Sequence, residues 1–196
     1  MEKHCSHIAF PECPVRSEYQ GICYEQYIPE QLVRDQIVTL SAQVQVREYE
    51  RVLYVLRGGL FLYEQLTRLQ DIECNYEKHA IEYHRHPVSG DRLIEKAVPA
   101  DVSGSVLVID DVWDTARTAR LIAEDLYRLP AVEQVTFAVV ARKDSVPGRV
   151  GVPGVTVYAA MELENRWLGG CGMDLGVEGP NNRYFRNLPE IVVRPE

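Results

Sequence analysis

The sequence contains several short apolar runs, and each run is followed by charged residues or glycines. This pattern restricts the choice of fold more than any other feature of the sequence. Strands buried on both faces of a parallel sheet have this continuous apolar pattern, whereas the helices that cover them repeat their apolar residues every three to four positions. The predicted elements, in order, are a helix at 29–50, a strand at 52–56, a helix at 60–69, strands at 74–83 and 105–110, a helix at 115–129, and strands at 135–141 and 155–160. This order predicts an α/β fold with a mostly parallel central sheet flanked by helices, in which ligands bind beyond the carboxyl ends of the strands.

The length of the chain is that of one domain. Its 196 residues are enough to bury a sizeable core but are few for two domains. No internal repeat and no Gly-, Ser- or Pro-rich linker divides the sequence. We therefore predict a single domain over residues 1–196, with an irregular N-terminal segment at 1–28, a core at 29–160 and a small C-terminal part at 161–196.

The charge of the chain limits its partners. The net charge is −8, from 21 Lys and Arg residues against 29 Asp and Glu residues. A protein that coats nucleic acid needs a basic surface, so this composition argues against nucleic-acid binding. A small anionic substrate is still compatible with it, provided that a local cationic site or a divalent metal ion receives the substrate.

Cysteine content and hydropathy indicate the compartment. Five cysteines at irregular spacing are more typical of reduced thiols in a cytosol than of a disulfide scaffold. No segment approaches the roughly 20 consecutive apolar residues of a membrane span, and the first residues lack a secretory signal. We expect a cytoplasmic protein without a membrane partner. His4, Cys5, His7 and Cys13 do not have the spacing of a zinc finger, so we expect a disordered or interface segment there.

The most informative segment is VLVIDDVWDTARTAR, at residues 106–120. The apolar strand brings Asp110, Asp111 and Asp114 to its end. The start of the following helix carries Thr115, Ala116, Arg117 and Thr118. Unpaired amides at a helix N-terminus bind phosphate, whereas adjacent carboxylates suit sugar hydroxyls or a divalent cation. The segment therefore predicts a site for a phosphorylated ribose.

The same segment is compatible with two further roles. Asp114 is a common type of N-cap residue and could only cap the helix that follows. An apolar strand that ends in two aspartates also holds the metal ion in nucleoside triphosphatases. The chain has no G-x-x-x-x-G-K-[ST] sequence, however, so this second alternative lacks its essential partner.

Residues 106–118 resemble the phosphoribosyl-diphosphate (PRPP) signature of type I phosphoribosyltransferases. Other segments are similar, in the same order, to the branch that acts on 6-oxopurines, the hypoxanthine/xanthine–guanine phosphoribosyltransferases. These segments are LRGG at 56–59, EYHRHPVSG at 82–90, ARK at 141–143, NRWLGGCGMDLG at 165–176 and YFRNLPEIVV at 184–193. The resemblance begins near residue 30 and implies the type I phosphoribosyltransferase fold, in which residues 161–196 form the base-binding hood and tail.

The chain departs from the pattern of that family in three places. Ala116 stands where the phosphate loop usually has glycine, which leaves this backbone less freedom to adopt a positive φ. Glu82 stands where a serine usually precedes the tyrosine of the mobile loop. The chain is several residues longer than the family between Asp174 and Arg186.

The resemblance implies roles at the PRPP end of the site. Asp110 and Asp111 would hold the ribose 2′- and 3′-hydroxyls, and residues 115–118 would bind the 5′-phosphate. Asp114 would lie near N7 of the purine as general base or would stabilise the ribosyl cation. The pyrophosphate would be bound by Arg57, Gly58 and Gly59, with a cis peptide between Leu56 and Arg57. Tyr83 would reach the pyrophosphate from a mobile catalytic loop that closes over PRPP. Arg186 would be a further PRPP- or nucleotide-binding residue. Taken without the resemblance, LRGG is an ordinary strand-to-helix turn.

The resemblance also implies how the base is bound. Lys143 would donate to the exocyclic O6, which favours hypoxanthine, guanine or xanthine over adenine, whose N6 amine is itself a donor. Trp167 would stack on the purine ring, Leu168 would offer backbone contacts, and Asp174 would accept from the 2-position or help to place a metal ion. His84, Arg85 and His86 belong to the predicted mobile loop rather than to a zinc site.

Together these features predict a purine-salvage enzyme. It would transfer 5-phosphoribose from PRPP to N9 of a 6-oxopurine and release pyrophosphate, with Mg²⁺ bound near Asp110, Asp111 and Asp174. The family implies a homodimer or homotetramer. Ala116 and Glu82 favour an alternative, a regulator of the same fold that senses PRPP or nucleotides without turnover. A phosphoribosyltransferase for another nucleobase is the third possibility.

Overall fold

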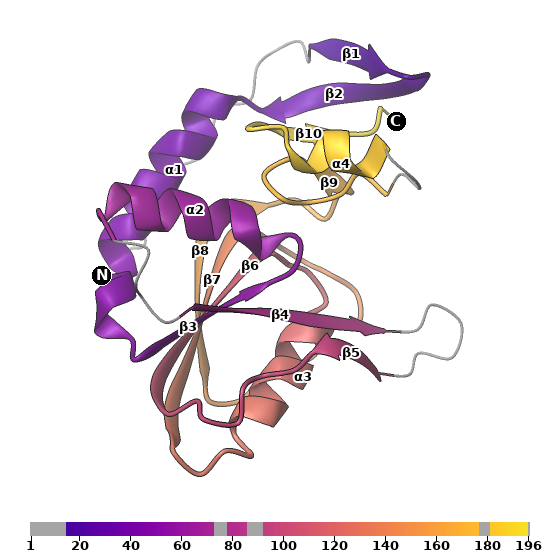
Figure 1. The fold of residues 1–196 in the computed structure, drawn as a ribbon. Helices are drawn as coiled ribbons and strands as arrows, with labels where there is room; N and C mark the ends of the chain where they lie inside the picture. The colour runs from indigo at the N-terminus through magenta and orange to yellow at the C-terminus, as the bar shows by residue number, and fades with distance from the viewer. Residues whose placement is uncertain (1–14, 73–77, 86–91, 177–180, 196) are drawn as a thin grey trace.

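The main sheet of the protein has six strands in the order β5-β4-β3-β6-β7-β8 (Figure 1). The computed structural model describes residues 15–72, 78–85, 92–176 and 181–195. All neighbouring strands of this sheet are parallel except β4 and β5, which form an antiparallel pair. The strands are β3 (Arg51–Val55), β4 (Lys78–Arg85), β5 (Arg92–Lys96), β6 (Gly104–Trp113), β7 (Val132–Lys143) and β8 (Val155–Leu163).

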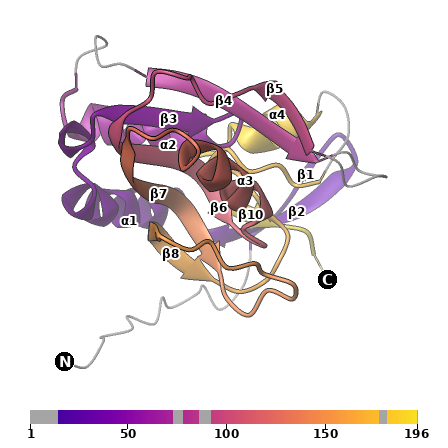
Figure 2. The same ribbon diagram turned by 90° about the horizontal axis from the view of Figure 1, so that it is seen from below.

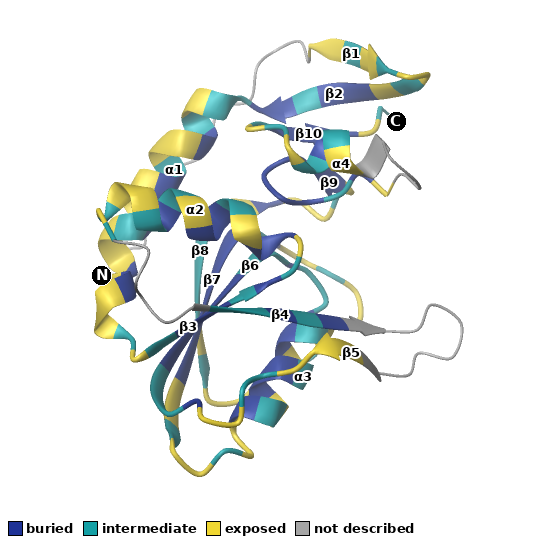
Figure 3. Ribbon diagram, in the orientation of Figure 1, coloured by how far each residue is buried: buried dark blue, intermediate teal, exposed yellow. Residues whose placement is uncertain are grey.

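Helices cover both faces of this sheet. Helices α1 (Glu30–Gln43) and α2 (Gly59–Leu69) pack on one face, and α3 (Arg117–Leu126) packs on the other (Figures 1 and 2). The central strands are therefore buried from both sides, and Val106 to Ile109 have no exposed surface (Figure 3). This double burial explains why their sequence is continuously apolar. A short 3₁₀ helix, Val46–Glu48, separates α1 from β3.

A second, smaller sheet lies beside the carboxyl ends of the main strands. Its order is β1-β2-β10-β9, and it is formed by β1 (Arg16–Tyr19), β2 (Ile22–Ile28), β9 (Leu168–Gly169) and β10 (Ile191–Val193). Helix α4 (Asn181–Arg186) packs against it through Phe185, which is fully buried with Tyr24 and Val192. The N-terminal and C-terminal parts of the chain thus build one layer together (Figure 1).

This second sheet corrects the prediction for the N-terminus. Residues 16–28 are not irregular, because β1 and β2 form a hairpin and β2 pairs with β10. Strand β2 has no continuous apolar run, and its pairing partner lies more than 160 positions away, so the sequence pattern did not show it. We call this second sheet together with α4 the hood. It contains residues of β1 and β2 as well as part of the predicted segment 161–196. The histidines and cysteines at positions 4–13 lie outside the described residues.

The core elements are confirmed, with changes at their ends. The helix predicted at 29–50 stops at Gln43, and the helix predicted at 115–129 spans Arg117–Leu126. Strand β6 was predicted to end at Asp110 but continues to Trp113, and therefore also includes Asp111. Strand β5 was not predicted. Strand β4 continues through His84 and Arg85, which were expected to belong to the mobile loop. Within the ranges that the structure describes, no helix is long and apolar enough to cross a membrane.

Candidate active site

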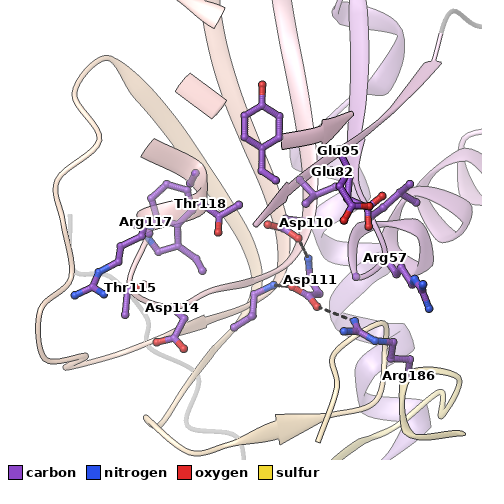
Figure 4. A pocket seen from close by; sticks show the side chains of 18 residues that line it. Arg57, Glu82, Glu95, Asp110, Asp111, Asp114, Thr115, Arg117, Thr118 and Arg186 are labelled. Carbon is purple, nitrogen blue, oxygen red and sulfur yellow. Dashed lines mark hydrogen bonds and ion pairs between the residues drawn. The ribbon is translucent and has the colours of Figure 1, made fainter. Parts of the chain in front are cut away.

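The predicted ribose-phosphate segment lies at the carboxyl end of β6, at the edge of a cavity of about 690 Å³. Asp110 and Asp111 directly follow the apolar part of the strand, and both are partly buried. The turn that follows brings Asp114, Thr115, Ala116, Arg117 and Thr118 to the wall of the same cavity (Figure 4). The structure thus brings the polar residues of the predicted signature together around one cavity.

The turn between β6 and α3 takes a left-handed step at Ala116. Its backbone has φ 59° and ψ 14°, which places this alanine in the region where glycine is usual. The predicted restriction therefore does not prevent the conformation, although a side chain makes it more costly. Helix α3 begins at the next residue, Arg117, so that the amides of its first turn have no partner within the helix.

The glycines of LRGG allow the turn after β3 to approach β6 closely. A Cβ atom on Gly58 would lie 2.0 Å from Oδ2 of Asp111, and one on Gly59 would lie 2.3 Å from the carbonyl oxygen of Ile109. The peptide bond between Leu56 and Arg57 is cis, as the resemblance implied. Leu56, Arg57 and Gly58 line the cavity, whereas Gly59 does not and instead packs against the backbone of Ile109.

A second cavity of about 150 Å³ adjoins the first and shares the wall formed by Asp111, Val112 and Asp114. Its other lining residues are those predicted to bind the base together with one methionine: Lys143, Trp167, Leu168, Met173 and Asp174. Leu168 is buried in β9, and Trp167 is 61% exposed at the cavity mouth, where its indole Nε1 donates to the carbonyl oxygen of Asp174 over 3.2 Å.

Lys143 and Asp114 connect the two cavities. Lys143 ends β7 and is buried, and its Nζ donates to Oδ2 of Asp114 over 3.0 Å. Strands β6 and β7 are parallel neighbours, with Trp113 paired to Arg142, so the residues that follow them emerge side by side. The sheet register therefore brings together two side chains that are 29 positions apart in the sequence.

Arg186 links the hood to the end of β6. From α4 it donates to a carboxylate oxygen of Asp174 and to the carbonyl oxygen of Gly172, and its Nη1 lies 4.0 Å from Oδ2 of Asp111 (Figure 4). A Cβ atom on Gly172 would lie 2.1 Å from the carbonyl oxygen of Gly58. Gly172 is thus packed tightly against the β3–α2 turn.

The two adjacent aspartates carry an electrostatic penalty. Desolvation by burial, followed by the charge of Asp111, raises the pKa of Asp110 well above its ordinary value. Desolvation also raises the pKa of Asp111, although the Arg186 guanidinium acts in the opposite direction. A ligand or cation that compensates this charge would therefore favour the ionised pair.

The donor set is suited to Mg²⁺ held jointly with a substrate. Among the residues described, no group of three or more His, Cys, Asp or Glu side chains is arranged to hold a metal ion alone. Mg²⁺ is usually bound through one or two carboxylates, with waters and substrate phosphates completing its ligands. Asp110 and Asp111 supply such carboxylates at the cavity, whereas Asp174 is already paired with Arg186.

Tyr83 lies on β4, within the strand predicted at 74–83 and not in the catalytic loop that the resemblance implied, and it is only 3% exposed. Its hydroxyl donates to Oδ2 of Asp125 on α3 over 2.8 Å and accepts from the amide of Val98. The side chain therefore joins the sheet to α3, and the residue also lines the larger cavity. A catalytic role for Tyr83 stays a prediction. Residues 86–91 of the predicted mobile loop lie outside the described residues.

Three side chains near the site were not predicted to belong to it. Glu82 and Glu95, from β4 and β5, line the first cavity close to Arg57 (Figure 4). Arg149 contacts the turn after β6 through its guanidinium group. The sequence singled out Glu82 only as a departure from the family pattern. Arg149 belongs to a loop without periodicity and Glu95 to a short edge strand, so neither segment carried a signal that would have singled these two residues out.

The fold is that of type I phosphoribosyltransferases. No family model and no curated protein sequence matches the chain. Among solved structures, a hypoxanthine-guanine-xanthine phosphoribosyltransferase is similar with a TM-score of 0.66 and 21% identity, over 86% of this chain and 95% of that one. A hypoxanthine-guanine phosphoribosyltransferase from Bacillus anthracis is similar with a TM-score of 0.63 and 19% identity, over 87% of this chain and 97% of that one.

A third similar structure contains a nucleotide. It is a hypoxanthine phosphoribosyltransferase from Trypanosoma cruzi in complex with the product IMP, with a TM-score of 0.67 and 19% identity, over 91% of this chain and 93% of that one. These likenesses cover nearly the whole length of each protein and establish the fold of this chain. Which reaction the fold serves here has to be argued from its own residues.

Proposed function

We propose that this protein is a purine-salvage phosphoribosyltransferase, which transfers 5-phosphoribose from PRPP to N9 of hypoxanthine, guanine or xanthine. The observation that carries the proposal is the pair of adjoining cavities that share Asp111 and Asp114. One cavity offers carboxylates beside the start of a helix, which suits a ribose phosphate. The other offers a buried cation and an exposed indole ring, which suits an oxopurine.

In the larger cavity, the ribose and its phosphate would lie along the end of β6. The 5′-phosphate would accept from the amides and hydroxyls of Thr115 and Thr118, while Asp110 and Asp111 would accept hydrogen bonds from the ribose hydroxyls. The pyrophosphate would lie toward Arg57, Gly58 and Arg186. Gly58 and Arg186 adjoin Asp111, so the two arginines and a divalent cation would have to offset the repulsion between the pyrophosphate and the aspartate pair.

In the smaller cavity, the purine would stack against Trp167 and place its O6 at the Lys143 ammonium. Lys143 has three donor hydrogens, so it can bond O6 while keeping its contact with Asp114. The N6 amine of adenine is a hydrogen-bond donor and would face the Lys143 ammonium, which is also a donor. This arrangement favours 6-oxopurines over adenine.

The reaction forms the N9–C1′ bond and breaks the bond between C1′ and the pyrophosphate oxygen. Asp114 lies where the two cavities meet, so it would accept the proton that the purine loses or stabilise the positive charge that develops on the ribose. Asp110 and Asp111 would hold Mg²⁺ together with the substrate. When bound, Mg²⁺ offsets the charge of the pyrophosphate as it leaves.

Incubation of the protein with PRPP, Mg²⁺ and one base at a time tests the proposal, with pyrophosphate and nucleotide measured as products. We expect nucleotide from hypoxanthine, guanine or xanthine and none from adenine. Binding of PRPP and nucleotide without product from any base would establish the regulator instead. Product from another nucleobase alone would establish a different phosphoribosyltransferase.

Ala116 favours the regulator less than the sequence indicated. Ala116 was expected to hinder the phosphate turn, yet it adopts the left-handed conformation there. Glu82 still differs from the pattern of the family, and it lines the cavity next to Arg57. Kinetic measurements on the variant Glu82→Ser would show whether this carboxylate limits turnover.

The remaining parts of the proposal concern assembly and location. A homodimer or homotetramer is expected from the resemblance, and size-exclusion chromatography with light scattering would measure it. The free thiols of Cys23 and Cys171, together with the odd number of cysteines in the chain, support a reducing compartment such as the cytosol.

A further inference from the structure

The loop that follows β7 holds the turn between β6 and α3 by two carbonyl oxygens. Nε of Arg149 donates to the carbonyl oxygen of Asp114 over 3.1 Å, and the amide of Val150 donates to the carbonyl oxygen of Thr115 over 3.0 Å. Arg149 does not line the larger cavity, whereas Asp114 and Thr115 do. The contacts therefore reach the turn through its backbone and not through the space that a ligand would fill.

The same guanidinium has a second anchor on the sheet. Nη2 of Arg149 donates to the carbonyl oxygen of Lys143, the last residue of β7. Arg149 thus bridges the backbone at the end of one central strand to the turn after its neighbour. A planar guanidinium can bond two separate carbonyl groups at once, which a lysine ammonium on a flexible stem does less well.

The direction of these bonds matters for the amides of the turn. In a trans peptide the carbonyl of one residue and the N–H of the next point in opposite directions. A carbonyl of Asp114 that is turned toward Arg149 therefore directs the amide of Thr115 away from it. The bond from Val150 to Thr115 does the same for the amide of Ala116, the residue with the left-handed backbone.

We propose that Arg149 is a positioning residue for phosphate binding, which orients the amides of Thr115 and Ala116 by holding the backbone of the turn from its outer side. It would touch neither the substrate nor the reacting atoms. This inference rests on the proposed function, because it takes the turn as the site of the 5′-phosphate. Arg149 lies outside the signature. Its removal should lower the affinity for ligands that carry the 5′-phosphate and should leave the affinity for the base unchanged.

The test compares the affinities of the full-length protein for guanosine 5′-monophosphate and for guanosine, which differ only in the phosphate. In Arg149→Ala we expect the affinity for the nucleotide to fall about tenfold, since one preorganised set of donors is lost, while the affinity for guanosine changes less than about twofold. In Arg149→Lys we expect most of that loss to remain, because a lysine restores the charge but not the two-carbonyl bridge.

Arg142→Ala is the matched control. Arg142 lies next to Lys143 and pairs with Glu162 on β8, so its removal changes the charge equally without touching the turn. We expect its affinity for the nucleotide to equal that of the wild type. Thermal unfolding of each variant shows whether it is folded, and if Arg149→Ala is not, the comparison of Arg149→Lys with Arg142→Lys decides.

Each other outcome has a defined meaning. An unchanged nucleotide affinity in Arg149→Ala, an equal loss for guanosine and nucleotide, or full recovery in Arg149→Lys would overturn the inference. A wild-type protein that binds the nucleotide but makes no product would overturn the proposed function alone. A wild-type protein that does not bind the phosphorylated ligand more tightly than guanosine would overturn both.

Discussion

Lys143 and Asp114 form an ion pair of 3.0 Å between the ends of two neighbouring strands. The lysine side chain is 8% exposed and the aspartate side chain is 39% exposed, so the cation lies inside and the carboxylate faces the cavities. A buried ammonium requires such a partner, because an unpaired charge in the interior is costly. The pair joins the predicted base-selecting group directly to the predicted general base.

The variant Asp114→Asn tests the role of the carboxylate. An amide cannot accept a proton at neutral pH, so we expect kcat to fall by about 10²- to 10³-fold while the KM for PRPP changes less than about threefold. Steady-state kinetics measure both quantities. Asp144→Asn is a suitable control because Asp144 is exposed nearby and does not line either cavity. An unchanged rate in Asp114→Asn would remove Asp114 from the base role.

The variant Lys143→Met keeps the length of the side chain and removes its donor. We expect the KM for guanine or hypoxanthine to rise about tenfold or more, since a hydrogen bond to O6 is lost, with little change in the KM for PRPP. Arg142→Met is the control, because it removes a neighbouring charge outside the cavity. Equal increases in both KM values would indicate that Lys143 acts on the whole site and not on the base.

The variant Gly58→Ala tests the close approach of the β3–α2 turn to β6. The added methyl group would lie 2.0 Å from Oδ2, 2.3 Å from Cγ and 2.9 Å from Cβ of Asp111, so rotation of that side chain alone does not clear it. We expect the affinity for PRPP to fall at least tenfold, as judged by titration calorimetry. In Gly151→Ala the added methyl group meets nothing within 4 Å, and its affinity should match the wild type.

The variant Ala116→Gly tests the backbone of the phosphate turn. A left-handed conformation costs an alanine about 1–2 kcal/mol, whereas glycine adds roughly 0.4–1 kcal/mol of chain entropy to the unfolded state. We expect a net gain of about 0.5 kcal/mol in the free energy of unfolding, measured by urea denaturation. Ala119→Gly, inside α3, should instead lose about 1 kcal/mol. A loss in both variants would show that the turn carries no such strain.

The raised pKa of Asp110 predicts how stability depends on pH. Because the folded state holds this proton more tightly than the unfolded state, the free energy of unfolding should decrease as the pH rises from the unfolded pKa of the carboxyl to its folded pKa. We expect Asp110→Asn to flatten this part of the profile and to unfold at a higher temperature than the wild type at pH 7. Calorimetry between pH 4 and pH 8 measures both effects. A steeper profile in the variant would contradict the direction of the shift.

The local features of the site could be predicted because they are contiguous in the sequence. The apolar run that ends at Ile109 has to be buried, and the residues after it have to emerge at the end of the strand. An apolar run also predicted the strand at 135–141, and the resemblance of ARK placed Lys143 at its end; the structure confirms both strands. The left-handed backbone at Ala116 is also a property of one turn, so a departure from glycine could be recognised there.

Contacts between distant segments could not be predicted in this way. Strand β2 pairs with β10, Arg186 reaches Asp174 and Asp111, and Tyr83 bonds to Asp125 on α3, and none of these pairs is marked by a local pattern. The buried strands and the polar groups at their ends follow from the order of residues alone, because hydrophobic periodicity and turn chemistry act over a few residues. The contact between the hood and the main sheet, and the contact of Arg149 with the turn after β6, arise from the three-dimensional fold, because they depend on register and packing between elements far apart in the chain.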